Sequence, residues 1–201
     1  MKKLITLFLT LVTLTVNSQV IDWDNFDSNV ADSVLFVEMN NFRDSLGLST
    51  FVYSKVLYDN ISLYSTGEMV KELRLFHPDK KYLSEKYKQD IKTEVINTVG
   101  MGTYEASLAL IMGPGEVCQT HFGFFGTPSK PYKTYKALVK GVISQWCRSK
   151  PHYTLITSDN KNRIWIGSGS MNLVKEKNKF STLESNTNVI YTSFQIYQLL
   201  Y

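Results

Sequence analysis

The apolar residues in the first part of the chain recur every three or four positions, which is the spacing of one face of an α-helix. From Ala31 onward this face comprises Leu35, Met39, Phe42 and Leu46. Gly47 follows directly and is a natural C-terminal stop, because a helix often ends on a glycine in the left-handed conformation. The pattern therefore predicts a first helix from about Ala31 to Gly47, followed by a short extended segment, "LSTFVYS".

A second helix is predicted after Ser54, because serine is a favoured N-cap residue. Its apolar face reads Leu57, Ile61, Ser65, Met69 and Leu73. The small Ser65 in the middle of this face would let another element approach closely. The helix is expected to end near Phe76, because Pro78 disfavours helical geometry in the residue before it.

Weaker patterns mark the middle of the sequence. Residues 79–92 are charged and rich in tyrosine, which predicts a solvated loop or a short helix, and "TEVINTVG" (93–100) predicts a short extended segment. Residues 100–132 are rich in glycine and proline, so we expect a long loop with one helical turn at Tyr104–Ile111. The clearest helix of the protein comes next. Its unbroken apolar face reads Tyr135, Leu138, Val139, Val142, Ile143 and Trp146.

The last third of the sequence alternates with the period of two that is typical of strands. In "NRIWIGSGSMNLV", Ile164, Ile166 and Ser168 fall on one face and Trp165 and Gly167 on the other. The segment "TNVIYTSFQIYQLL" alternates in the same way, and a polar turn, "KEKNKFSTLES", separates the two. These segments predict an antiparallel pair. Helices early, a helix in the middle and strands late predict an α+β or a layered α/β/α domain.

The N-terminus predicts export. "MKKLITLFLTLVTLTVNSQV" has two lysines, then an apolar run from Leu4 to about Val16, then small residues, which is the order of a cleavable signal peptide (1–18). The cut is expected between Ser18 and Gln19. The run is shorter than the roughly 20 residues that a membrane-spanning helix needs. The mature protein is therefore expected to be secreted or periplasmic, with no transmembrane segment after cleavage.

Charge and length narrow the class of protein. The formal net charge of +4 becomes +2 when Lys2 and Lys3 leave with the leader, and no basic block remains. Nucleic acid is therefore not an expected partner. A polar lead-in (19–32) precedes a single domain (33–201), which is long enough to bury a core without help.

Two cysteines, Cys118 and Cys147, occur in a protein that is expected to be exported. An even number in an oxidising compartment predicts one disulfide. The bridge would close a loop of about thirty residues, which the loop-closure entropy model values at roughly 3–4 kcal/mol.

The ordered motifs resemble those of the CAP domain, the SCP-like superfamily of cysteine-rich secretory, antigen 5 and pathogenesis-related proteins, in its bacterial single-domain form. The matching segments are "NNFRDSLGLSTFVYSKVL", "LFH", "TEVI", "WCRSKPH", "RIWIGSGSMNL" and "VIYTSFQIY". They span roughly residues 33–198, and residues 98–132 look like an insertion. The resemblance implies a three-layer α-β-α sandwich around a small, mostly antiparallel sheet.

The resemblance also implies a site, an open cleft in which histidines face acidic residues. Residue by residue, it assigns His77, Glu94 and His152 to that cleft, while Ser149 stands where many animal members carry a second glutamate. Imidazoles and a carboxylate suit zinc or a related divalent ion. The alternative is that each histidine ends a helix and caps carbonyls without metal. Ser149 would then orient His152, and the buried face of its helix makes Trp146 a core residue.

These residues favour a non-enzymatic binding module, whose ligand would be a metal ion, a small apolar molecule or an envelope component. The competing class is a secreted hydrolase. It would be assisted by a metal on the same residues, or it would use Cys118 as a thiolate with His152 and Asp159. A Cys118–Cys147 disulfide would exclude the thiolate. His121, three residues after Cys118, lacks further ligands at a recognisable spacing.

Overall fold

The computed structural model describes residues 19–73, 85–99, 116–122, 132–160, 163–177 and 186–200. Side chains are described in all of these except residues 85–86, 116–122, 175–177, 186–189 and 200. The described residues form helices and one mixed sheet, which confirms the broad α+β class. In this part of the protein, no helix has the length and apolar character needed to cross a membrane.

The first helix, α2 (Ser28–Ser45), follows the prediction. The side chain of Asp27 caps its N-terminus by accepting a hydrogen bond from the Val30 backbone N–H at 3.1 Å. Gly47 has a φ of +70°, the left-handed conformation that glycine adopts without a steric penalty. A two-residue strand, β1 (Val52–Tyr53), then replaces the longer extended segment.

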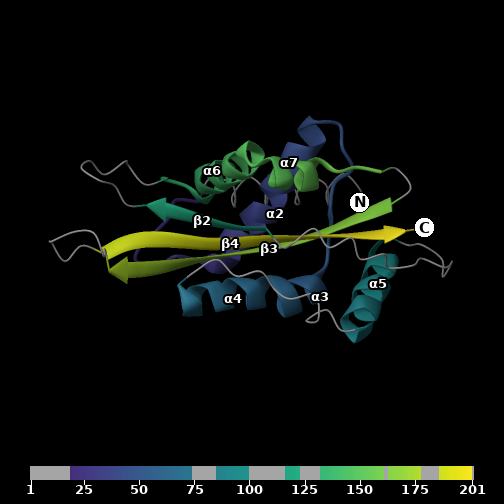
Figure 1. The fold of residues 1–201 in the computed structure, drawn as a ribbon, viewed down its shortest axis with the longest axis horizontal. Coiled ribbons are helices and arrows are strands. Elements are labelled where there is room, and N and C mark those ends of the chain that lie inside the picture. The colour runs from purple at the N-terminus through teal and green to yellow at the C-terminus, as the bar shows by residue number, and fades with distance from the viewer. Residues whose placement is uncertain are drawn as a thin grey trace, which may run out of the picture.

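The second helix begins as predicted, and the Ser54 hydroxyl accepts from the Leu57 N–H at 3.1 Å. It is built from α3 (Lys55–Leu57), a π-helical turn η1 (Tyr58–Ser62) and α4 (Leu63–Glu72). It ends earlier than Phe76, because Leu73 turns into the left-handed conformation at φ 50°. The three parts of this helix lie against one face of the sheet (Figure 1).

Residues 85–99 form a helix, α5 (Glu85–Val99). It agrees with the short helix that was one of the two alternatives for residues 79–92, and it corrects the extended segment expected for residues 93–100. Ile91 and Val95, four residues apart, are fully buried against Leu57 and Ile61. Tertiary packing of this apolar face outweighs the strand preference of its β-branched residues.

A strand, β2 (Glu116–Phe122), lies where a loop was expected. It pairs antiparallel with β4 (Asn186–Leu200), with Cys118 opposite Thr192. β2 lies at the edge of the sheet, where a strand needs only one partner. Its alternating pattern is short and is flanked by glycines and prolines, which favoured the loop interpretation. The helical turn predicted at residues 104–111 lies outside the described residues.

The third predicted helix is confirmed as α6 (Tyr135–Arg148), which Thr134 caps. A further helix, α7 (Lys150–Thr157), starts directly after Ser149. Pro151 does not stop it, because a proline is tolerated in the first turn of a helix, where its missing N–H is not needed. His152 therefore lies in the first turn of α7, and the expectation that it ends a helix is wrong.

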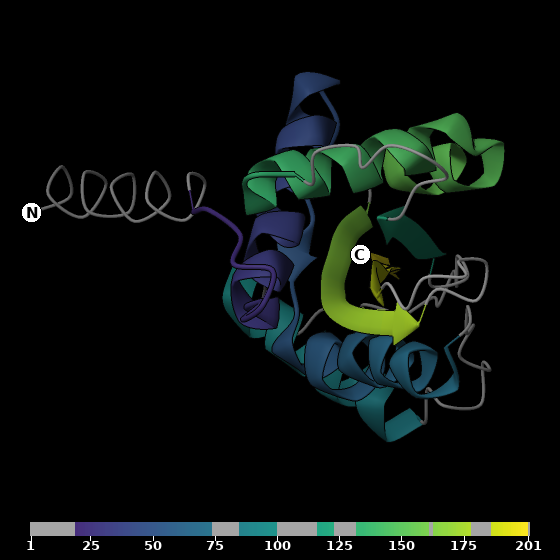
Figure 2. The same ribbon diagram turned by 90° about the vertical axis from the view of Figure 1, so that its left-hand side faces the viewer.

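The predicted antiparallel pair is confirmed as β3 (Arg163–Lys177) and β4, with Gly169 opposite Phe194. The four described strands follow the order β1-β3-β4-β2, and only the β1–β3 pair is parallel. Helices α2, α6 and α7 lie on one side of the sheet, and α3, α4 and α5 lie on the other (Figures 1 and 2).

The alternation of β3 and β4 divides the core between these two sides. Trp165 and Phe194 face α2 and α6 in the larger apolar cluster. Ile166 and Tyr197 face α3 and α5 in the smaller one. Burying apolar side chains on both faces of a sheet is a strong driving force for folding.

The contact of η1 and α4 with the sheet adds hydroxyl pairs to the apolar contacts of Ile61 and Met69. Ser62 Oγ lies 2.6 Å from Ser168 Oγ, and Thr66 Oγ1 lies 3.1 Å from Ser193 Oγ. All four hydroxyls belong to buried residues. The buried Ser65 lies in the same helix, as expected of a small residue where two elements approach closely.

Candidate functional site

The carboxylate of Glu94 lies at the N-terminus of α3. Its Oε2 accepts from the Ser54 hydroxyl at 2.5 Å and from the Val56 N–H at 3.2 Å. Its Oε1 accepts from the Lys55 N–H at 2.8 Å. A negative charge is stabilising at the positive end of a helix, whose first N–H groups have no partner inside the helix. The observed role of Glu94 is therefore to cap α3 from α5.

Of the predicted site residues that the structure describes, neither His152 nor Ser149 contacts the Glu94 carboxylate. His152 lies on α7, and α7 and α5 lie on opposite sides of the sheet (Figure 1). The hydroxyl of Ser149 does not cap α7, although its backbone carbonyl accepts from the Tyr153 N–H at 2.8 Å. His77 lies outside the described residues, so its place in a shared cleft stays a prediction.

These observations do not fit the metal set that the resemblance implies. Both oxygens of Glu94 already accept hydrogen bonds, and His152 lies beyond the sheet. Within the described ranges, no group of three histidine, cysteine, aspartate or glutamate side chains is placed to hold a metal ion. The coordination of a metal by His77, Glu94 and His152 gains no support from the described residues.

The thiol alternative gains no support either. Cys147 is a free, half-buried cysteine, and burial raises the pKa of its thiol, which disfavours the reactive thiolate. The side chains of Cys118 and His121 lie outside the described residues, and because Cys147 is free, the structure gives no support to the predicted Cys118–Cys147 disulfide. Asp159, the third residue of that alternative, is engaged by Arg43 and Ser49.

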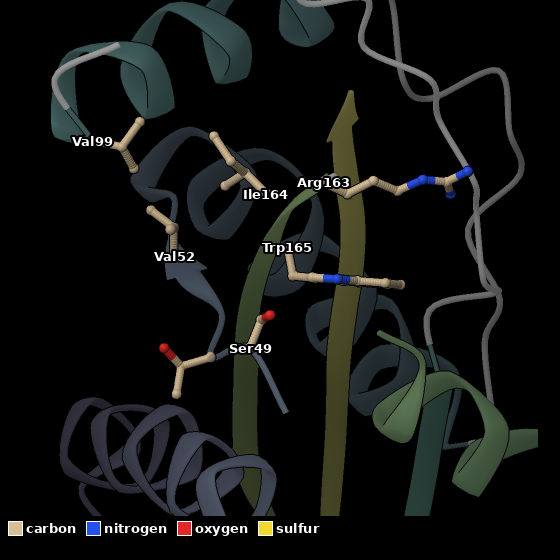
Figure 3. Close-up of a pocket in the computed structure, with 7 residues that line it drawn as sticks. Ser49, Val52, Val99, Arg163, Ile164 and Trp165 are labelled. Carbon is tan, nitrogen blue, oxygen red and sulfur yellow. The ribbon is translucent and has the colours of Figure 1, made fainter. Parts of the chain in front are cut away.

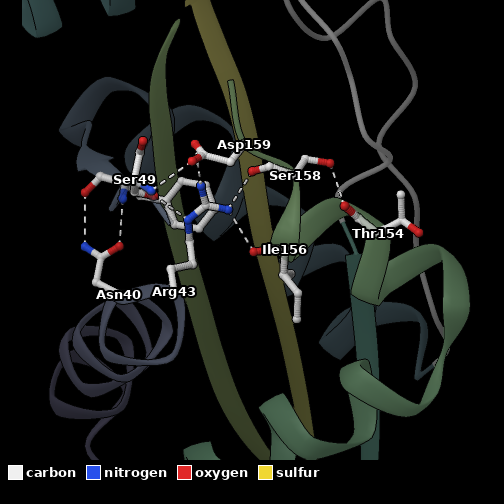
Figure 4. Close-up of polar contacts among 8 residues, drawn as sticks. Asn40, Arg43, Ser49, Thr154, Ile156, Ser158 and Asp159 are labelled. Atoms are coloured by element: carbon white, nitrogen blue, oxygen red, sulfur yellow. Dashed lines mark hydrogen bonds and ion pairs between the residues drawn. The ribbon is translucent and has the colours of Figure 1, made fainter. Parts of the chain in front are cut away.

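Arg43 is the centre of a buried polar network (Figure 4). Its side chain has no exposed surface, and its Nε donates to the Ser49 carbonyl at 2.6 Å. Its Nη1 donates to the carbonyls of Ile156 and Ser158 at 2.8 and 2.9 Å, and its Nη2 lies 3.6 Å from Asp159 Oδ1. The network ties the end of α2 to the loop before β1 and to the end of α7.

In this network the effect of burial on each pKa is opposed by the charge of the partner residue. Burial lowers the pKa of Arg43, and Asp159 opposes that effect. Burial also acts to raise the pKa of Asp159, but hydrogen bonds from Ser49 and the Arg43 charge outweigh it and lower that pKa. The guanidinium carbon lies 4.3 Å from the ring centre of Phe51 and 5.3 Å from that of Trp165, within cation–π range.

The network explains the pattern N-x-x-R-x-x-x-G-L that carried the resemblance. Asn40 holds Phe51 by accepting from its N–H at 2.7 Å and donating to its carbonyl at 3.0 Å. Arg43 makes the bonds described above, and Gly47 supplies the positive φ. The pattern therefore fixes the turn between α2 and β1.

An open hollow of about 540 Å³ lies beside this turn, between β1, the start of β3 and the end of α5 (Figure 3). It is lined by Ser49, Thr50, Val52, Val99, Arg163, Ile164 and Trp165. Figure 3 shows Val52, Val99 and Ile164 gathered on one side of β3, with Arg163 and Trp165 extending toward the other. Its volume lies in the range of small-molecule sites, roughly 300–1,000 Å³.

The hollow is lined by both apolar and polar residues. Val99 is among the exposed large apolar residues of the protein, while Trp165 is nearly buried. The Arg163 guanidinium donates to the side-chain amide oxygen of Gln198. Within the described part of the protein, no carboxylate forms an ion pair with Arg163. The hollow therefore offers apolar surface on one side of β3, and Arg163 adds a positive charge to its lining on the other side.

Sequence reasoning missed these lining residues. It placed Ile164 and Trp165 on opposite faces of a strand correctly, but it gave Val99 to an extended segment and left Arg163 without a role. A hollow made by three separate segments leaves no local motif. The apolar face of α5 was the signal that could have brought Val99 next to Ile164.

No family model, curated protein or solved structure matches this protein. The fold and the hollow define an α+β domain with helices on both faces of a mixed sheet and an open concave surface at one edge. Kinship with the CAP domain stays a prediction from the sequence motifs.

Proposed function

We propose that this protein is an exported, CAP-like domain that acts as a binding module, and that it holds a small apolar ligand with one polar or acidic end in the hollow beside β1. The observation that carries the proposal is the hollow itself, which Val52, Val99 and Ile164 line on one side of β3 and Arg163 and Trp165 line on the other. Concave, mostly apolar surfaces with a few polar groups are typical of ligand sites.

The surroundings of the hollow support binding. The Arg43 network fixes Ser49 through its carbonyl, and Trp165 packs over the same guanidinium. Two lining residues are therefore held in place before a ligand arrives, and a rigid site loses less entropy on binding than a flexible one.

The CAP-like kinship rests on the order of the motifs and on the α+β class. The Asn40–Arg43–Gly47 pattern has a structural role here, and the strands of "RIWIGSGSMNL" and "VIYTSFQIY" pair antiparallel. A metal on His77, Glu94 and His152 remains the alternative that the resemblance offers, and no described contact favours it.

Calorimetric titration of the mature protein with octan-1-ol and with octanoate tests the hollow. Both probes are expected to bind, octanoate the more tightly, and Arg163→Gln is expected to remove only the advantage of octanoate. Val99→Lys should weaken both by about tenfold or more, because it brings a charge into an apolar site. A lysine suits the last turn of α5, so the helix is retained.

Leu63→Lys is the matched control, because Leu63 is an exposed apolar residue on α4, outside the hollow lining. It should bind both probes as the parent does. Absence of binding by the parent, or equal loss in Val99→Lys and Leu63→Lys, would contradict the proposed site.

A further inference from the structure

The first described residues are already part of the fold. The Gln19 carbonyl accepts from the Tyr135 N–H at 3.3 Å, and Val20 forms an antiparallel bridge with Thr134. Ile21 donates to the Lys133 carbonyl at 3.0 Å, and it is 6 % exposed in the larger core cluster. The expected leader cleavage would therefore place the new N-terminus on a backbone segment that the fold holds.

The new amino group would be placed at the positive end of a helix. Tyr135, which holds the Gln19 carbonyl, is the first residue of α6, and the first turn of α6 contains no acidic residue. Lys133 adds a positive charge next to it in sequence. The acid nearest in sequence, Asp22, accepts hydrogen bonds from Asp24 and Asn25 within its own turn. An ammonium group is disfavoured at such a helix end.

We infer that Gln19 of the mature protein is a modification site, at which the N-terminus closes into a pyroglutamate lactam. In this step the neutral α-amine of Gln19 attacks the carbonyl carbon of the residue's own γ-amide. A new amide C–N bond forms, the original bond from that carbon to the amide nitrogen breaks, and this nitrogen leaves as ammonia with the displaced proton. No oxidant or co-reactant is required, and the product has no charge at its N-terminus.

The structure permits this ring closure without loss of contacts. The ring uses only the α-nitrogen, the Cα and the γ-amide arm of Gln19, which is exposed. The backbone carbonyl that accepts from Tyr135 takes no part, so the bridge of Val20 to Thr134 stays in place. The lactam would also block aminopeptidases, which could otherwise trim the protein toward the buried Ile21.

This inference rests on the proposed export, and the intact mass of the full-length protein secreted from a bacterial host tests both. A product that starts at residue 19 and lacks one ammonia is the expected result. A product that starts at Gln19 with a free amine, or that is cut at another position, overturns the lactam and leaves export standing. A product that retains its leader overturns export as well. Gln19→Ala is the control that should keep a free amine.

A second measurement follows ammonia loss in purified mature protein whose uncyclised Gln19 is exposed by a site-specific protease. Thr134→Asp keeps a favoured N-cap and adds a negative charge beside the amine, so closure should slow by about two- to fivefold. Thr154→Asp, an exposed position on α7, should close at the parental rate. If the parent does not close, the inference is wrong. If Thr134→Asp and the parent close at equal rates, the N-terminus of α6 has no influence on the reaction.

Discussion

At the scale of single residues, Arg43 shows how one buried charge can join three distant backbone segments. Its five N–H donors form a rigid fork that a lysine cannot imitate. Arg43 donates to the carbonyls of Ser49, Ile156 and Ser158, and the carboxylate of Asp159 balances its charge. Because these three hydrogen bonds are buried or part-buried, losing the donor leaves the carbonyls without compensation for the water they gave up on folding.

Arg43→Met should therefore lower the free energy of unfolding by about 1–3 kcal/mol, the usual cost of leaving buried acceptors without their donor. Urea unfolding followed by far-UV circular dichroism measures it. Arg148→Met is the matched control, since Arg148 is exposed at the end of α6, and it should change stability by no more than about 0.5 kcal/mol. Similar values for the two variants would show that the Arg43 network is not stabilising.

A second residue-scale prediction concerns two glycines. A Cβ on Gly169 would lie 2.6 Å from Leu35 Cδ2 and 2.7 Å from Phe194 Cδ2, whereas a Cβ on Gly67 would meet nothing within 4 Å. Gly169→Ala should destabilise by about 1–3 kcal/mol, because it overfills the core between α2 and β3. Gly67→Ala should stabilise by about 0.5–1 kcal/mol, because alanine suits the interior of α4. Thermal unfolding of both variants checks the opposite signs.

At the scale of elements, α3 depends on a carboxylate from a helix that lies forty residues further along the sequence. A three-residue helix followed by a π-turn has little intrinsic stability. Its first N–H groups are satisfied by Ser54 from its own N-cap and by Glu94 from α5. When α5 packs on Leu57 and Ile61, it therefore also brings Glu94 to the N-terminus of α3 as a cap.

Glu94→Ala should cost about 1–2 kcal/mol and Ser54→Ala a similar amount, as measured by urea unfolding. The double variant should lose less than the sum, because the Ser54 hydroxyl donates to Glu94. Asp90→Ala, exposed on the same helix, is the control and should be near neutral. The zinc content of Glu94→Ala separates the two roles: a fall to zero from a loaded parent would make Glu94 a metal ligand after all.

The elements that could be predicted from sequence are those whose pattern is long and continuous. Helices α2 and α6 and the β3–β4 pair each extend over more than ten residues of one period. The second half of α5 was given to an extended segment because its β-branched residues are typical of strands, and only contact with Leu57 and Ile61 favours a helix. Strand β2 is short and lies at an edge, among residues typical of loops. The hollow combines Val99 of α5 with Arg163 of β3, so an error in α5 hid the site too.

At the scale of the whole molecule, apolar clusters pack on both faces of the sheet, and one face adds buried hydroxyl contacts. Apolar packing dominates toward α2 and α6, whereas hydroxyl contacts link η1 and α4 to β3 and β4. Asp32 joins the two sides, because it belongs to α2 yet accepts from the Tyr58 hydroxyl of η1 and the Met171 N–H of β3, both at 2.6 Å. Its ionisation therefore acts on the assembly of all three layers.

Burial raises the pKa of Asp32 from an ordinary value of 3.8 to about 7, although hydrogen bonds from Tyr58 and Met171 act to lower it. The folded protein thus keeps a proton that the unfolded protein releases. The stability that this proton contributes is complete below pH 3.8, declines as the pH rises, and is gone above pH 7, with a slope of about 1.4 kcal/mol per pH unit in between. The pKa of Asp159 is lowered from 3.8, so its ionisation changes the stability only below pH 3.8, outside the range in which Asp32 acts.

Asp32→Asn removes the ionisable group from a buried position and keeps an amide oxygen that can accept from Met171. In urea titrations between pH 4 and pH 7, the free energy of unfolding of the parent should fall as the pH rises because of Asp32. This part of the pH dependence should be absent from the variant. Asp90→Asn, exposed on α5, should keep the parental slope. Equal slopes for the parent and Asp32→Asn would mean that Asp32 ionises normally in the folded state. The contacts joining α2, η1 and β3 would then tolerate a full negative charge at their centre.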